Sequence, residues 1–102
     1  MIAEIFYFDG CPNYHAAREL AERVSRDLGI EPDIRMVEVA DPQAAEELRF
    51  LGSPTIRIDG HDVEPGADTR EQFMLACRIY RRESGLAGLP DERWVREALA
   101  GA

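Results

Sequence analysis

The sequence predicts one α/β domain, residues 1–102, in which helices cover both faces of a four-stranded mixed sheet. Short apolar runs alternate with amphipathic helical stretches in the first half, which is typical of strands joined by crossover helices. Two strands in succession and a closing helix follow in the second half, so the expected order is βαβαββα. A length of 102 residues suffices for one such domain and is too short for two.

The first half of the chain predicts a parallel crossover unit. Residues 2–8, IAEIFYF, are β-branched and aromatic with a single charge at Glu4, as in a largely buried strand. Pro12 suits the first turn of a helix over residues 13–28, because a proline there loses no intrahelical hydrogen bond. Alternation over residues 33–39, DIRMVEV, then indicates the second strand. The apolar stripe of the helix consists of residues spaced three and four apart, namely Tyr14, Ala17, Ala21, Val24 and Leu28.

The second half predicts a short helix, two strands and a closing helix. Asp41 and Pro42 supply an N-cap and a first-turn proline for the short helix. The segment LACRIYR alternates well, which predicts the fourth strand with Leu75, Cys77 and Ile79 on its buried face. The helix, the third strand, a polar irregular segment, the fourth strand and the last helix are expected over residues 42–51, 54–58, 61–73, 75–81 and 90–99, respectively.

Composition and charge disfavour several function classes. Acidic residues outnumber basic ones by 20 to 12, and nucleic acids and anionic membranes need a basic footprint instead. All 12 basic residues are arginine, which rules out Schiff-base lysine chemistry and a phosphate-loop lysine. No apolar run approaches the roughly 20 residues of a membrane helix, and the N-terminus lacks a signal-peptide pattern. We therefore expect a cytoplasmic protein without a bound cofactor or metal loop.

The most informative stretch is FDGCPNYH, residues 8–15, because it brings a cysteine to a strand–helix junction. At a helix start, the positive end of the macrodipole and unpaired N–H groups favour a thiolate at Cys11 and a pKa below about 8.5. The loop position keeps this thiol reachable. The alternative is that Cys11 fills space as a small apolar residue, as free cysteines commonly do.

Cys77 has two interpretations. It is either a buried strand residue or a resolving thiol for Cys11. A disulfide needs Cα atoms within about 7 Å, so we expect that such a bond would require movement of the chain. The two cysteines allow one disulfide, which in a cytosolic-looking sequence does not amount to a structural disulfide framework. A Cys11–Cys77 bond would therefore be transient.

Four further side chains near the cysteines each have a functional and a plain structural interpretation. His15, four residues after Cys11, is an acid or base for the thiol, a second ligand for a soft metal, or a solvated helix residue. Asp9 tunes the thiol, although its charge would oppose a thiolate, or it belongs to the turn. Arg78 and Tyr80 line a substrate face or lie on the exposed side of an edge strand.

The order of elements, with Cys-Pro after the first strand, resembles the thioredoxin fold over nearly the whole chain. The motifs FDGCPN, GSPTI and CRIYR together are similar to small bacterial thioredoxin-like proteins named as a "DF family (seleno)protein". Some relatives are named as containing selenocysteine, at the position of Cys11, which implies redox chemistry there. Tyr14 stands where dithiol relatives have their second cysteine, so the usual two-thiol mechanism cannot run on this loop alone.

The same resemblance implies a binding loop opposite the thiol. It implies that Gly52-Ser53-Pro54-Thr55 is a cis-proline loop facing Cys11, although only about 5–6% of X–Pro bonds are cis in general. Backbone groups of Ser53 and Thr55 would then pair with a peptide or thiol substrate like an added strand. Pro12 and Tyr14 complete the expected substrate-binding residues beside the thiol.

These observations lead to three functional hypotheses. The first is a cytoplasmic, glutaredoxin-like thiol–disulfide oxidoreductase in which Cys11 is the single nucleophile, resolved by an external thiol or by Cys77. Its substrates would be a low-molecular-weight thiol or a protein disulfide. The second is binding of a soft metal or metalloid by Cys11 with Cys77 or His15. The third is a non-catalytic interaction module that binds a partner at the cis-proline loop.

Overall fold

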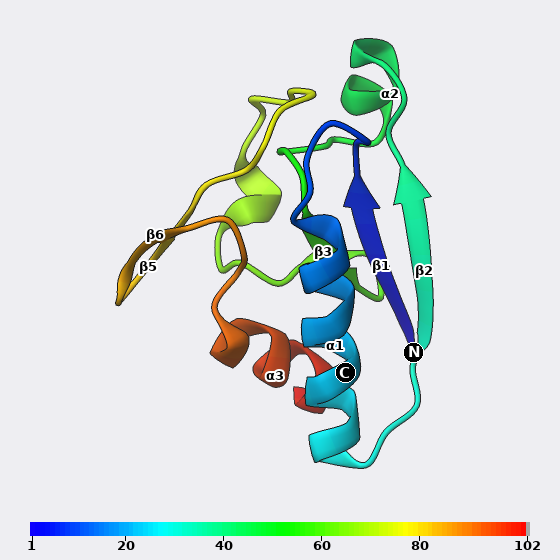
Figure 1. Cartoon of the computed structure of the whole chain (residues 1–102), viewed down its shortest axis with the longest axis vertical. Coiled ribbons are helices and arrows are strands. Elements are labelled where there is room, and N and C mark those ends of the chain that lie inside the picture. The colour runs from blue at the N-terminus through cyan, green and yellow to red at the C-terminus, as the bar shows by residue number, and fades with distance from the viewer. Residues whose placement is uncertain (102) are drawn as a thin grey trace.

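The central sheet has four strands in the order β2-β1-β3-β4 (Figure 1). The computed structural model describes residues 1–101 and gives these strands as β1 (Ile2–Tyr7), β2 (Asp33–Glu38), β3 (Thr55–Ile58) and β4 (His61–Asp62). Strand β1 is parallel to β2 and antiparallel to β3, and β3 is antiparallel to β4. The four-stranded mixed sheet expected from the sequence is therefore confirmed.

In the described residues, three α-helices and one 3-10 helix accompany the sheet: α1 (Tyr14–Leu28), α2 (Pro42–Glu47), η1 (Ala67–Thr69) and α3 (Glu92–Gly101). Asp41 caps α2 as predicted, since its Oδ1 accepts a hydrogen bond from the N–H of Ala44 at 2.8 Å. The prediction that this helix continues to residue 51 was wrong. Arg49 adopts a φ of 55°, and a left-handed residue cannot continue a right-handed helix. Within residues 1–101, no helix is long and apolar enough to cross a membrane.

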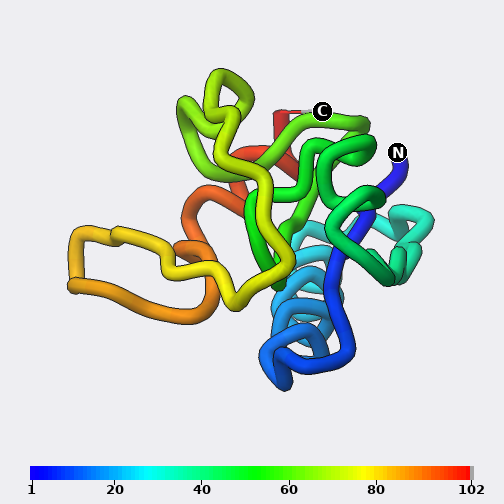
Figure 2. Tube along the Cα trace, turned by 90° about the horizontal axis from the view of Figure 1, so that it is seen from above, coloured from blue at the N-terminus to red at the C-terminus, as the bar shows by residue number. Residues whose placement is uncertain are grey.

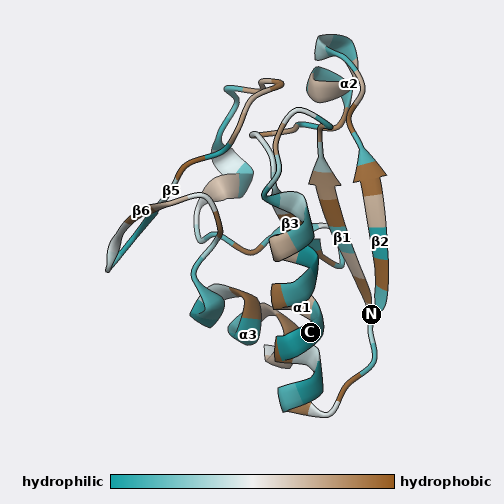
Figure 3. Ribbon diagram, viewed as in Figure 1, coloured by the Kyte–Doolittle hydropathy of each residue, from teal (hydrophilic) through white to brown (hydrophobic). Residues whose placement is uncertain are grey.

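Two apolar clusters lie on opposite faces of β1, because neighbouring residues of a strand point to opposite sides. Ile5 belongs to the larger cluster, between the sheet and the helices α1 and α3, whereas Phe6 belongs to the smaller one. Ala45 of α2 packs into this smaller cluster with Val39 and Phe50. In Figure 3, β1 is largely hydrophobic, while β2 and α1 are hydrophobic only in part. The larger cluster contains the buried residues Ala3, Ile5, Ala17, Leu20, Ala21, Val24, Ile56, Ile58, Val63, Val95 and Leu99.

The fourth strand of the sheet is β4, not residues 75–81 as predicted. Asp59 and Gly60 both have positive φ, at 49° and 88°, and form a two-residue turn that folds His61–Asp62 back onto β3. The sequence interpretation recognised this turn but not the strand after it, because two residues are too few to show a period. The polar segment expected to be irregular thus contains both β4 and η1.

Residues 75–81 instead lead away from the sheet. Cys77 makes a single parallel bridge with Ser53, and the chain then enters a separate hairpin of β5 (Tyr80–Arg82) and β6 (Gly85–Ala87). Figure 2 shows this hairpin projecting from the rest of the molecule. The predicted face is reversed, because Arg78 and Tyr80 are buried while Ile79 is 67% exposed.

Candidate functional site

Cys11 lies in the turn between β1 and α1, two positions before Asn13, the N-cap residue of the helix. Its N–H donates to the carbonyl of Phe8 at 3.1 Å, and its Sγ donates to the carbonyl of Ser53 at 3.4 Å. The residue is 0% exposed. The expectation that the loop keeps this thiol reachable was therefore wrong.

The loop opposite Cys11 contains Ser53, whose backbone is fully engaged within the chain. The Ser53–Pro54 peptide bond is cis. The N–H of Ser53 donates to the carbonyl of Ala76, and its carbonyl accepts from the N–H of Arg78, both at 2.8 Å. The same carbonyl also accepts the hydrogen bond from the Cys11 thiol. One backbone carbonyl therefore holds both the turn of Cys11 and the segment that carries Cys77.

The predicted pairing of this loop with a substrate strand was wrong, because the chain itself already pairs with the backbone of Ser53. Residues 76–80, called the Cys77 segment from here on, occupy the backbone groups of Ser53 that a substrate would need. Thr55 is 0% exposed and pairs with Phe6 inside the sheet, while its hydroxyl donates to the carbonyl of Gly52 at 2.7 Å. The edge on which the interaction-module hypothesis depends is thus covered by the chain itself.

Cys77 forms a bridge with Ser53, the residue that also accepts the Cys11 thiol, and its side chain is exposed rather than buried as predicted. Hydrogen bonding to the Cys11 side chain is the largest cause that raises the pKa of the Cys77 thiol, followed by partial desolvation and by the charge of Cys11. Both cysteines are free thiols. Both cysteines therefore meet at Ser53, and the expectation that a disulfide between them requires movement of the chain stays a prediction.

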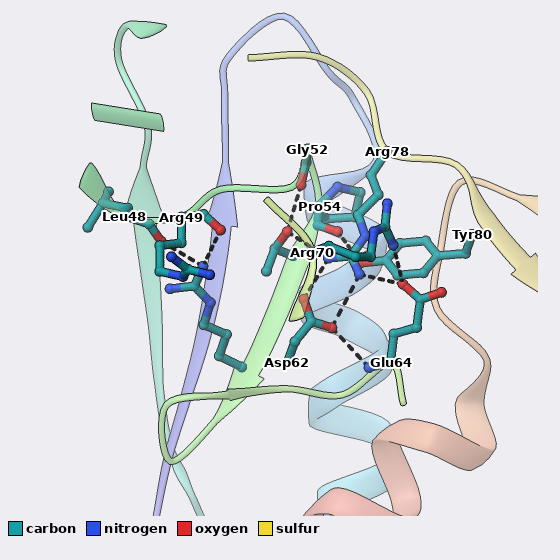
Figure 4. Close-up of polar contacts among 11 residues, drawn as sticks. Leu48, Arg49, Gly52, Pro54, Asp62, Glu64, Arg70, Arg78 and Tyr80 are labelled. Atoms are coloured by element: carbon teal, nitrogen blue, oxygen red, sulfur yellow. Dashed lines mark hydrogen bonds and ion pairs between the residues drawn. The ribbon is translucent and has the colours of Figure 1, made fainter. Parts of the chain in front are cut away.

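A buried arginine anchors the Cys77 segment to the sheet (Figure 4). Arg78 donates to Asp62 Oδ2 at 2.7 Å, to Glu64 Oε1 at 2.6 Å and to Thr55 Oγ1 at 3.0 Å. Arg78 is only 3% exposed. Both predicted positions, on a substrate face or on the exposed side of an edge strand, were therefore wrong. Burial alone would lower the pKa of Arg78, but the hydrogen bonds to Asp62 and Glu64 and the charge of Asp62 outweigh it and raise this pKa, which keeps the guanidinium charged.

Tyr80 fixes the other end of the Cys77 segment. Its hydroxyl donates to the carbonyl of Pro54 at 2.5 Å, its ring lies 4.3 Å from the guanidinium carbon of Arg78, and it is 0% exposed. Burial raises the pKa of this tyrosine, so the hydroxyl keeps its proton and remains a donor. Because neighbouring residues alternate and Arg78 and Tyr80 point inward, Cys77 and Ile79 take the outward positions.

Gly52 permits the close approach between the loop and the Cys77 segment. Its φ is 119°, and a Cβ atom there would lie 2.9 Å from the Cβ of Arg78 and 3.1 Å from the carbonyl of Ala76. A side chain would push the two segments apart. The sequence interpretation treated Gly52 as part of the loop motif and missed Asp62 and Glu64, whose contacts with Arg78 no local pattern reveals.

The remaining predicted site residues lie around the turn of Cys11. Pro12, Asp9 and His15 are exposed. Tyr14 is half-buried, and its ring stacks on that of Tyr7 at 4.3 Å and contacts that of His15 at 4.2 Å. Across the described part of the chain, no group of three or more His, Cys, Asp or Glu side chains is arranged to hold a metal ion.

Comparisons with known proteins agree with the thioredoxin-like arrangement. No protein-family model matches the chain, and no solved structure matches it. A curated thioredoxin from Methanocaldococcus jannaschii is 34% identical to it over 77 residues, which span 74% of this chain and 89% of the relative. The narrower likeness to DF family proteins, and with it a bacterial source, stays a prediction.

Proposed function

The chain belongs to the thioredoxin-like superfamily, and on that premise we propose that it is a thiol–disulfide oxidoreductase working through Cys11 and Cys77. The observation that supports this proposal most directly is that both cysteines approach Ser53: the Cys11 thiol donates to its carbonyl, and Cys77 forms a parallel bridge with the same residue. In the proposed reaction, the two thiols become one disulfide and pass two electrons to a substrate disulfide, which leaves as two thiols.

Cys77 supplies the second thiol that the turn of Cys11 lacks. Tyr14 stands at the position where a local partner cysteine would be, and its ring is stacked on Tyr7. A partner from a distant segment performs the same chemistry, provided that the fold holds the two sulfurs together. The contacts of Ser53 and Arg78 provide this restraint.

The proposed substrates are a low-molecular-weight disulfide or a protein disulfide, and an external thiol would return the oxidised protein to the dithiol form. We place this cycle in the cytoplasm, where thiols are kept reduced and cysteine pairs of this kind are catalytic rather than structural. The sequence supports this location by its low cysteine count.

The test is oxidation of the purified protein followed by mass spectrometry and an activity assay. We expect the wild type to lose the mass of two hydrogen atoms and to yield a linked peptide pair containing Cys11 and Cys77. It should also accelerate reduction of a protein disulfide by dithiothreitol, and the Cys11→Ser and Cys77→Ser variants should not. Absence of the linked peptides, together with a rate equal to that of dithiothreitol alone, would refute the proposal.

The contact between two thiols also suits a soft metal or metalloid, which is the second candidate function. Arsenite is the probe, because thiolates bind it strongly and it needs no further protein ligand. Stoichiometric retention of arsenite by the wild type, lost in Cys11→Ser and Cys77→Ser, without any acceleration of disulfide reduction would favour this function over the first.

A further inference from the structure

We propose that Cys77, and not Cys11, is the thiol that attacks the substrate disulfide, and that Cys11 is the resolving thiol. This order reverses the roles that the sequence suggests. It rests on the proposed oxidoreductase function and specifies which residue meets the substrate.

Access to solvent distinguishes the two thiols. Disulfide exchange requires the attacking sulfur to approach a substrate sulfur directly. Cys77 is exposed, and the outward row of its segment continues with Ile79, which is 67% exposed. Cys11 is 0% exposed, so no substrate sulfur reaches it in this conformation.

An initial attack by Cys11 would require a rearrangement that uncovers its sulfur and breaks its hydrogen bond to the carbonyl of Ser53. Ser53 also holds the Cys77 segment through two backbone hydrogen bonds, so a displacement of this loop would disturb that segment too. An initial attack by Cys77 requires none of these changes. The exposed thiol is therefore the one that the folded protein presents.

The raised pKa of Cys77 slows its attack on a disulfide only modestly. Hydrogen bonding to Cys11 is the largest cause that raises the pKa of Cys77. Each unit of increase lowers the thiolate fraction at neutral pH about tenfold but raises the nucleophilicity of that thiolate about threefold. The net cost is about threefold per unit, whereas burial withholds Cys11 from the substrate altogether.

The two steps balance as follows. The Cys77 thiol loses its proton to solvent, its sulfur bonds to one substrate sulfur, and the other leaves as a thiolate that takes up a proton. Cys11 then loses its proton and attacks the sulfur of Cys77. This step breaks the mixed disulfide, releases the second substrate thiol and leaves the Cys11–Cys77 disulfide. One disulfide is reduced to two thiols, and two protein thiols are oxidised.

The experiment treats native protein with dithiobis(nitrobenzoate) and follows the coloured thiol that is released. We expect Cys11→Ser and Cys11→Ala to release one equivalent and to keep a stable nitrobenzoate adduct on Cys77. The wild type should release two equivalents and carry no adduct, because Cys11 resolves it. Cys77→Ser should react at least about tenfold more slowly than Cys11→Ser, because access to the sulfur limits exchange. Its reaction should become faster when denaturant exposes Cys11.

Two controls make the outcome decisive. Circular dichroism verifies that each variant is folded, and the substitution Ser84→Cys in a Cys11→Ser, Cys77→Ser background gives the rate of an ordinary exposed thiol, since Ser84 is exposed. A native rate for Cys77→Ser equal to that of the wild type would overturn the inference and leave the proposed function intact if the wild type still forms the internal disulfide. A wild type that stops at the nitrobenzoate adduct would overturn both.

Discussion

Replacing Arg78 by methionine is expected to destabilise the fold strongly, because the change leaves two carboxylates in a poorly solvated site without their cation. The side chains of Asp62 and Glu64 are only 4% and 17% exposed, and that of Arg78 is 1% exposed. Methionine keeps the apolar stem of the arginine and removes its donors. The loss therefore comes from the ion pairs more than from packing.

The magnitude follows from the burial of these groups. Removing one partner of a buried ion pair costs about 3–5 kcal/mol, since the remaining charge is left uncompensated. For a domain of this size, each kcal/mol shifts the unfolding midpoint by about 4–8 °C, so the expected decrease is on the order of 12–40 °C. A domain stability of about 5–15 kcal/mol would lose a large share.

Urea and thermal unfolding at neutral pH measure this effect, with Arg81→Met, an exposed arginine of the following strand β5, as the matched control. The control should stay within about 0.5 kcal/mol of the wild type. Adding Asp62→Asn and Glu64→Gln to Arg78→Met should recover part of the loss, because neutral side chains no longer need a cation. If Arg78→Met equals Arg81→Met in stability, the buried ion pairs contribute nothing and the argument fails.

Further predictions concern the same site. The pH midpoint of Cys77 alkylation by iodoacetamide should lie above that of an ordinary exposed thiol in the wild type and fall in Cys11→Ser, since Cys11 raises the pKa of this thiol; an unchanged midpoint would contradict the effect of Cys11. Because the folded-state pKa of this thiol is raised, its contribution to stability is complete below the unfolded-state pKa and is lost as the pH rises through the folded value. Gly52→Ala should destabilise the protein to urea by about 1–3 kcal/mol through backbone strain and the clash with the Cys77 segment, whereas Gly101→Ala, with open space around it, should not. Tyr80→Phe should lower the free energy of unfolding by about 1–3 kcal/mol, because it leaves the buried carbonyl of Pro54 without its donor. The same substitution should raise the reduction potential of the cysteine pair, measured against glutathione. Equal potentials for the variant and the wild type would show that this tyrosine does not act on the redox pair.

The elements of the first half could be predicted because local patterns decide them. A β-branched and aromatic run gave β1, the spacing of apolar residues gave α1, and Asp41 with Pro42 gave the start of α2. These features depend on residues within one or two turns of one another, so a single sequence contains the information. The end of α2 at Glu47, just before the left-handed Arg49, has no such local cause in the side chains around it.

The error at residues 75–81 has a different origin. Alternation reveals which residues share a face, but not which face is buried. The charge of Arg78 suggested the outer face, whereas Asp62 and Glu64 neutralise it in the interior. Those partners are 16 and 14 residues earlier in the chain, and only the folded arrangement brings the three side chains together.

The contacts that stabilise this site also bear on the redox balance of the proposed Cys11–Cys77 pair. Hydrogen bonds to Ser53 hold the Cys77 segment and the Cys11 thiol against the same loop before any covalent bond forms, which reduces the ordering that the disulfide requires. The arrangement and the bond then stabilise each other by the same free energy, since linkage is reciprocal. For a two-electron couple, about 30 mV corresponds to about 1.4 kcal/mol. A change that loosens the Cys77 segment should therefore lower the free energy of unfolding and raise the reduction potential together, and this joint shift distinguishes a redox pair built into the fold from two cysteines that are neighbours by chance.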